Sequence, residues 1–161
     1  MKKNNLFVCL AGFISLSVTI FMVNCASTPK SGGYTAEEWY TRGGLYFYLV
    51  KDYQLAIEDF SKALELDPNH YNAYMARGRA YLAIDNIEMA VADFSKAISL
   101  FPMLEPEPYA WRGLYHFQNE NYTLAKADFE AVIQIDPDDK HGFTSTAKKA
   151  LEEDIPELEN M

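Results

Sequence analysis

Residues 71–104 are YNAYMARGRAYLAIDNIEMAVADFSKAISLFPML, and the same order of residue types occurs before and after this stretch. The dipeptide Asp-Phe stands at 59–60, 93–94 and 128–129, with spacings of 34 and 35 residues. Three other markers follow the same two spacings: glycines (Gly44, Gly78, Gly113), alanines (Ala56, Ala90, Ala125) and prolines (Pro68, Pro102, Pro137). A fixed period of this length is typical of arrays in which each copy is one small supersecondary unit.

Each copy is predicted to form two antiparallel helices. Glycine and alanine at the in-phase positions allow the two helices to approach closely, and neighbouring aromatic residues fill the space around them. Asp52, Asn86 and Asn121 stand where each second helix is expected to begin, and these residue types are favoured N-caps. The prolines end the second helix because proline cannot continue one. Thr35 and Glu38 have the spacing of a capping box that opens the first helix.

The period, the residue types and their order resemble the tetratricopeptide repeat. The resemblance covers three repeats, at 37–70, 71–104 and 106–139, and implies an all-α fold, a right-handed α-solenoid of helix-turn-helix units. It assigns three sets of residues to the first helix of the repeats: aromatics at Tyr40, Tyr74 and Tyr109, small residues at Gly44, Gly78 and Gly113, and a second position at Phe47, Tyr81 and His116. We expect a capping helix over 140–155, with one apolar stripe and one polar side, and then an acidic tail at 156–161.

The N-terminal segment, residues 1–24, differs in composition from the rest of the chain. Two lysines precede a mostly apolar, uncharged stretch from Phe7 to Val23, and Cys25 follows it. This order is typical of a secretory signal peptide. The position of the cysteine resembles a bacterial lipoprotein signal, which implies removal of residues 1–24, acylation of Cys25 and a flexible tether over 25–34.

Two alternatives stay open for this segment. No charge occurs in residues 4–29, and about 20 apolar residues suffice to span a bilayer, so an uncleaved signal anchor would give a single-pass protein. Simple secretion without acylation is the other alternative. All three place the folded part outside the cytoplasm. The lipoprotein interpretation places it in the bacterial cell envelope, anchored to a membrane and facing the periplasm or the exterior.

The composition limits the classes of function. The chain has 161 residues with 14 Lys and Arg against 23 Asp and Glu, a net charge of −9. It therefore has no surplus of cations for the phosphates of a nucleic acid. The two cysteines lie within the first 25 residues and the three histidines are scattered, so no metal-ligand spacing occurs in the repeats. No catalytic motif is present, and we expect neither enzyme activity nor a cofactor.

The resemblance implies that function lies on the concave face, which one side of each first helix lines. The residues that it assigns to a partner groove are Leu45, Tyr48, Leu49, Met75, Arg79, Leu82, Leu114 and Phe117. This stripe is apolar, with Arg79 as its one expected cation, and an exposed apolar stripe usually marks a binding site. We expect Arg79 to pair with a partner's carboxylate. The Lys/Asn clamp with which chaperone-binding members hold a peptide's terminal carboxylate is absent.

The expected function is a non-catalytic adaptor, tethered to a bacterial envelope membrane through acylated Cys25, that binds an envelope protein, peptide or helix in this groove. Other occupants of the groove stay open. They are a small apolar ligand of a transport system, the capping helix, the segment 27–34, and a second copy of the chain through self-association.

Overall fold

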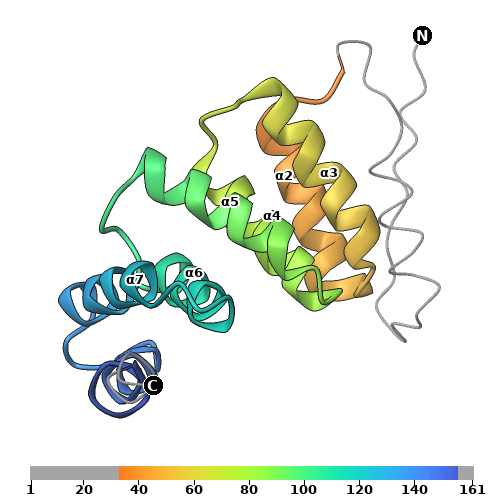
Figure 1. Ribbon diagram of the computed structural model, residues 1–161. Coiled ribbons are helices and arrows are strands. Elements are labelled where there is room, and N and C mark those ends of the chain that lie inside the picture. Colours follow the sequence, from red (N-terminus) through yellow and green to blue (C-terminus); the bar gives the residue numbers. More distant parts are fainter. Residues whose placement is uncertain (1–32, 156–161) are drawn as a thin grey trace, which may run out of the picture.

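The computed structural model describes residues 33–155. Within this range the chain is helical and contains no strand (Figure 1). The predicted signal peptide, Cys25, all but the last two residues of the predicted tether, and the predicted tail at 156–161 lie outside the described residues. No helix within 33–155 combines the length and apolar character needed to cross a bilayer.

The helices form three antiparallel pairs and a C-terminal unit. Their bounds are α2 (Ala36–Leu45), continued by the π-helix η1 (Tyr46–Val50), with α3 (Tyr53–Leu66); α4 (Tyr71–Ala83) with α5 (Ile87–Leu100); α6 (Glu107–Gln118) with α7 (Tyr122–Ile135); and α8 (Thr144–Lys149), continued by the π-helix η2 (Ala150–Asp154). Each α-helix packs on the next one along the chain, so the pairs follow one another in a curved row (Figure 1). The predicted all-α solenoid is confirmed.

The helix starts follow from the capping residues. The side chains of Asp52 and Asn86 each accept a hydrogen bond from the backbone N–H three residues later, at 3.1 and 3.3 Å. Thr35 and Glu38 make both hydrogen bonds of a capping box at the start of α2. Asn121 also occupies the N-cap position, but its side chain makes no capping hydrogen bond. Short polar side chains therefore satisfy the first N–H groups of three helices.

The core is built around the phenylalanine of each Asp-Phe dipeptide. Phe60, Phe94 and Phe129 are at most 1% exposed. In the second and third repeats a glycine of the first helix faces this ring. A Cβ on Gly78 would lie 2.6 Å from Phe94, and one on Gly113 would lie 2.8 Å from Phe129. These distances leave no room for a methyl group, which explains the glycines.

In the first repeat this role belongs to Gly43, so the assignment to Gly44 is wrong by one residue. A Cβ on Gly43 would lie 2.7 Å from the ring of Phe60, whereas a Cβ on Gly44 would meet no heavy atom within 4 Å. With Gly43 in place, the spacings between the three glycines become 35 and 35 residues.

The π-helix η1 accounts for this shift, because a π-turn holds one residue more than an α-turn. The N–H of Asp52 donates to the carbonyl of Tyr46 across six residues, whereas the equivalent bonds of the other two repeats span five. One inserted residue therefore lies in the first helix of repeat one. Residues before the insertion are therefore offset by one position relative to the other repeats. Trp39 and Tyr46 take the places expected for Tyr40 and Phe47.

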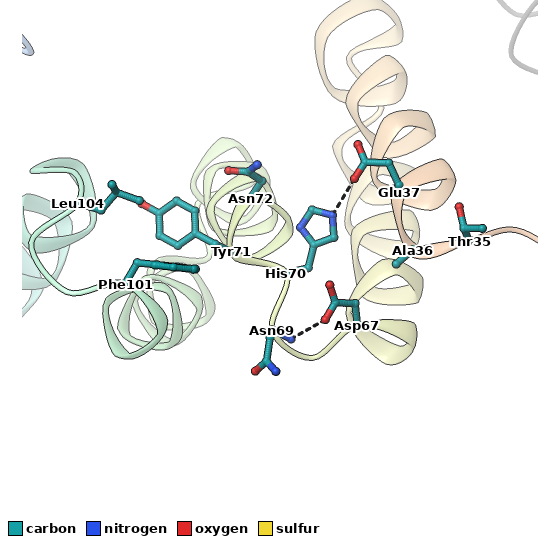
Figure 2. Close-up of a pocket in the computed structure, with 10 residues that line it drawn as sticks. All are labelled: Thr35, Ala36, Glu37, Asp67, Asn69, His70, Tyr71, Asn72, Phe101 and Leu104. Atoms are coloured by element: carbon teal, nitrogen blue, oxygen red, sulfur yellow. Dashed lines mark hydrogen bonds and ion pairs between the residues drawn. The ribbon is translucent and has the colours of Figure 1, made fainter.

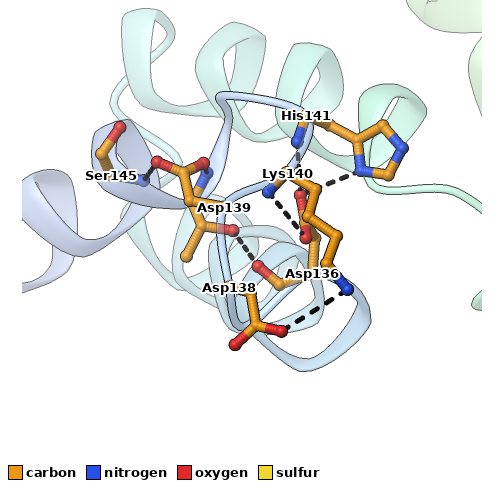
Figure 3. A network of polar contacts seen from close by, with 7 residues as sticks. Asp136, Asp138, Asp139, Lys140, His141 and Ser145 are labelled. Atoms are coloured by element: carbon orange, nitrogen blue, oxygen red, sulfur yellow. Dashed lines mark hydrogen bonds and ion pairs between the residues drawn. The ribbon is translucent and has the colours of Figure 1, made fainter.

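The C-terminal helix begins at Thr144, later than the predicted start at 140. Residues 136–143 form a hydrogen-bonded loop instead (Figure 3). The carboxylate of Asp136 accepts from two backbone N–H groups of this loop, at 3.0 and 2.8 Å. That of Asp139 accepts from the N–H groups of the first two residues of α8, at 2.7 and 3.2 Å. The two aspartates thus fix the loop and cap the helix that follows.

The C-terminal unit covers the end of the core. Ala147, Ala150 and Ile155 are buried in one cluster with Phe129 and Val132 of α7. The outer side carries exposed charged residues, among them Lys148, Lys149 and Glu152. A polar outer face is what the last element of a repeat array needs for solubility.

Candidate functional site

The first helices of repeats two and three are joined by an ion pair at Arg79. Its Nε donates to the carboxylate of Glu107 on α6 at 2.9 Å, and a second guanidinium nitrogen binds the same carboxylate. Glu105, in the linker before α6, lies 3.9 Å from Arg79. The hydrogen bond with Glu107 raises the pKa of Arg79, against the opposing effect of burial. Arg79 thus already has carboxylate partners in its own chain, whereas we expected it to be available to a partner protein.

Tyr48 and Leu49 are the most exposed of the predicted groove residues, at 59% and 60%. Both belong to η1, which continues the first helix of repeat one. Leu45 and Leu82 are half-buried. We call this surface the first-helix face. It is formed by α2 with η1, by α4, and by α6 with the linker before it.

Met75, Leu114 and Phe117 differ from the expectation of an open groove. Met75 is 2% exposed and belongs to the core cluster around Phe94, so it does not line an open surface. Leu114 and Phe117 are half-buried and pack against the C-terminal core cluster. Among the predicted groove residues, the most exposed apolar surface therefore lies in the first repeat, at the end of its first helix.

A cleft of about 690 Å³ opens where the N-terminal ends of α2 and α4 meet the linker after α5 (Figure 2). Its lining residues are Thr35, Ala36, Glu37, Asp67, Asn69, His70, Tyr71, Asn72, Phe101 and Leu104. One wall is apolar, since Phe101 and Leu104 are 53% and 54% exposed and Phe101 meets the ring of Tyr71 edge-on at 5.6 Å. The opposite end is polar and includes Glu37 and His70 (Figure 2). The repeat pattern of the sequence does not predict this cleft, because no single repeat contains all of its parts.

His70 joins the first two repeats at the polar end of the cleft. Its Nδ1 accepts the N–H of Ala73 at 3.3 Å and so caps α4. The ring proton of the neutral side chain therefore lies on Nε2, which is 3.3 Å from the carboxylate of Glu37. The ring also contacts Tyr40 of α2 at 4.9 Å. Within residues 33–155, no group of three or more His, Cys, Asp or Glu side chains is placed to hold a metal ion.

Tyr71 presents an unsatisfied polar group beside this cleft. The residue is 8% exposed, and within the described part of the chain its hydroxyl has no hydrogen-bond partner. Burial raises the pKa of this phenol to about 12. In Figure 2 the hydroxyl points toward Leu104, at the apolar end of the cleft. A buried hydroxyl without a partner is costly, so a ligand that supplied an acceptor there would gain a hydrogen bond.

Three arginine–aspartate pairs hold the two helices of each repeat together, and they were not among the residues expected from the sequence. They are Arg42–Asp59, Arg77–Asp93 and Arg112–Asp128, each with two hydrogen bonds of 2.5 to 2.9 Å. The aspartates are at most 4% exposed. The signal was an Arg-Gly dipeptide every 35 residues, which becomes visible once Gly43 is aligned with Gly78.

The fold is similar to solved structures of tetratricopeptide repeat domains. The Arabidopsis OM64 TPR domain matches with a TM-score of 0.62 at 23% identity, over 74% of this chain and 95% of that one. The second TPR domain of human RPAP3, in complex with the HSP70 peptide SGPTIEEVD, matches with a TM-score of 0.59 at 29% identity, over 71% and 95%. The first TPR of Spaghetti (RPAP3), bound to the HSP90 peptide SRMEEVD, gives 0.60 at 24% identity, over 78% and 98%.

The sequence is also similar to known proteins and to family models. Mouse serine/threonine-protein phosphatase 5 is 33% identical over 127 residues, in a match that covers 72% of this chain and 24% of the phosphatase. The chain thus spans about a quarter of the length of this relative. Models of the tetratricopeptide repeat match residues 36–70, 60–92 and 106–139. Because these matches together span more than half of the 161 residues, the chain belongs to the tetratricopeptide repeat family.

Proposed function

We propose that this chain is a non-catalytic adaptor that binds a peptide or helix of a partner protein on the first-helix face. The observation that carries the proposal is the pair Tyr48 and Leu49, which are 59% and 60% exposed on that face. Apolar side chains exposed side by side are typical of binding surfaces. The peptide complex of the human RPAP3 domain, which is 29% identical to this chain, supports a peptide as the ligand.

The proposal includes attachment to a bacterial envelope membrane through acylated Cys25. It is supported by the order of residues around the cysteine, with two lysines and an apolar stretch before it and a small polar run after it. One acyl chain gives only reversible membrane binding, and stable anchoring takes more than one. A cysteine with two or three acyl chains meets that requirement. The segment 25–34 then separates the repeats from the lipid surface.

Affinity capture from native membranes tests the adaptor function. We expect the tagged full-length chain to capture a defined envelope protein, and the variant Tyr48→Ser/Leu49→Ser to lose it. The matched control is Leu66→Ser/Leu124→Ser, which changes two similarly exposed apolar residues of the second helices, at 57% and 53%. Circular dichroism checks that both variants stay folded. Capture of the same proteins by both variants would show that the first-helix face is not the binding surface.

Metabolic labelling with an alkyne fatty acid tests the membrane attachment. We expect the wild type and Cys9→Ser to be labelled and to float with membrane vesicles. Cys25→Ser should be unlabelled and should keep its signal segment. Labelling of Cys25→Ser would contradict acylation at this residue, and an unlabelled wild-type protein in the membrane fraction would favour the uncleaved signal anchor.

A further inference from the structure

The positively charged side chains of the first-helix face are all paired with carboxylates of the same chain. The helices α2, η1, α4 and α6 contain four arginines and no lysine. Each arginine is bound to a carboxylate of the same chain, in the pairs Arg42–Asp59, Arg77–Asp93, Arg79–Glu107 and Arg112–Asp128. The lysines of residues 33–155 lie on the second helices, in the turn after η1 and in the C-terminal loop and helix. The cations of this face are therefore all committed within the described part of the chain.

Two carboxylates, one in the cleft and one beside it, are more exposed and less closely paired than these arginines. The side chain of Glu37 is 74% exposed and has a histidine, not a lysine or arginine, as its ion-pair partner. The side chain of Glu105 is 43% exposed and lies 3.9 Å from Arg79, whose closer partner is Glu107. Glu37 lines one end of the cleft, and Glu105 directly follows Leu104, which lines the other end. Asp67 adds a further carboxylate to the lining.

Apolar groups lie between these carboxylates. Phe101 and Leu104 expose more than half of their surface, at 53% and 54%, beside the buried ring of Tyr71. The hydroxyl of Tyr71 is buried and has no hydrogen-bond partner among residues 33–155, so its donor is unused. The cleft therefore combines an apolar wall, an unused donor and accessible negative charge.

We infer that the partner segment carries basic and apolar side chains together, and that it lies in the cleft with its cations at Glu37 and Glu105. This inference rests on the proposed function and names the chemistry of the partner. Complementary charge selects among partners with similar apolar contacts, because a like charge at the same place is repelled. Acidic peptides such as SRMEEVD and SGPTIEEVD, bound by the related domains, would find no uncommitted cation on this face.

Selection from a random dodecapeptide phage library tests the inference on the full-length chain in detergent micelles. We expect the selected peptides to contain more Lys and Arg than Asp and Glu, together with apolar residues. Peptides that are acidic or uncharged, and that lose binding to Tyr48→Ser/Leu49→Ser, would overturn the inference and leave the proposed function standing. Failure to recover any peptide above the level of that variant would count against both.

Binding of a synthetic copy of a selected peptide then tests which carboxylates its basic side chains contact. We expect Glu37→Gln/Glu105→Gln to bind it about ten-fold more weakly at low salt, and the difference to shrink as salt screens the charges. Glu58→Gln/Glu88→Gln removes the same charge from exposed positions of α3 and α5 and should bind within about two-fold of the wild type, because charges far from the peptide are screened. Equal binding by the two double variants would show that basic peptides bind elsewhere.

Discussion

Two adjacent glycines of the first repeat have different surroundings. Gly43 faces the ring of Phe60, whereas Gly44 faces open space. We expect Gly43→Ala to destabilise the fold by about 1–3 kcal/mol, because the added methyl overlaps a buried ring. Gly44→Ala should stabilise it by up to about 1 kcal/mol, because alanine is the better helix former. Urea unfolding of the two variants measures both free energies, and a larger loss for Gly44→Ala would contradict the position of the inserted residue.

The ion pair between Arg77 and Asp93 offers a second test at this scale. Asp93 is 4% exposed, and Arg77 also donates to Ser61 of the preceding repeat at 2.9 Å. We expect Asp93→Ala to lower the free energy of unfolding by about 3 kcal/mol, because it leaves a largely buried guanidinium without its carboxylate. The double variant Arg77→Met/Asp93→Leu should lose less than Asp93→Ala, because no uncompensated charge stays behind.

Urea unfolding of these two variants and of the single variants Arg77→Met and Asp93→Leu completes the cycle. If the double variant loses as much free energy of unfolding as Arg77→Met and Asp93→Leu lose together, the two partners are not coupled. The cycle should be run at moderate salt, because salt screens exposed charges elsewhere on the surface but screens this largely buried pair much less.

The loop before α8 makes the stability of that element depend on pH. Burial acts to raise the pKa of Asp136 and Asp139, but hydrogen bonds from backbone N–H groups outweigh it, so both pKa values lie below the ordinary 3.8. At a pH between the folded-state and the unfolded-state pKa of these carboxyl groups, the folded state therefore binds fewer protons than the unfolded chain. The stabilisation is present above about pH 4 and is lost as the pH falls through the folded-state pKa.

Amide exchange of Thr144 and of its neighbours in α8 between pH 5 and pH 2.5 measures this effect. We expect the protection of α8 to fall with pH before that of α4 and α5. Asp139→Asn should reduce the protection at pH 5 and flatten its pH dependence. Protection that stays constant down to pH 2.5 would show that the two carboxylates do not hold the loop.

The helical elements were predictable where local chemistry repeats. The capping residues, the closing prolines and the Asp-Phe dipeptides lie at fixed offsets, and each has a local physical role. The inserted residue was not predictable in the same way. The apolar residue types of η1 suit an α-helix as well as a π-helix, and Gly44 is as suitable a small residue as Gly43. The choice between them depends on contact with Phe60, seventeen positions away from Gly43.

The candidate site was harder to predict than the fold. Tyr48 and Leu49 are exposed, but Met75 is buried, and its burial depends on how repeats pack on one another. The bond between Arg79 and Glu107 likewise joins two repeats, so the pattern of a single repeat does not contain it. Sequence periodicity describes one repeat at a time, and the cleft exists only between repeats.

The net charge of −9 acts on the molecule as a whole. Excess charge of one sign destabilises a compact chain through self-repulsion, and salt screens it over about 10 Å at 0.1 M. We therefore expect the Tm to rise by a few degrees between 10 and 200 mM NaCl. Thermal unfolding followed by circular dichroism measures it, with sucrose at equal osmolality as the uncharged control. A Tm that falls with salt would mean that surface ion pairs outweigh the repulsion.

The single extra residue in η1 has a consequence for recognition by the whole array. Three identical repeats would present a surface with translational symmetry, on which a bound segment could slide by one repeat and find nearly the same contacts. The insertion widens the end of one first helix by a residue relative to its counterparts, because the π-turn holds one residue more than an α-turn. Tyr48 and Leu49 lie in this turn. The end of the first helix of repeat one therefore differs from its counterparts, so a segment bound there would have a single position and direction.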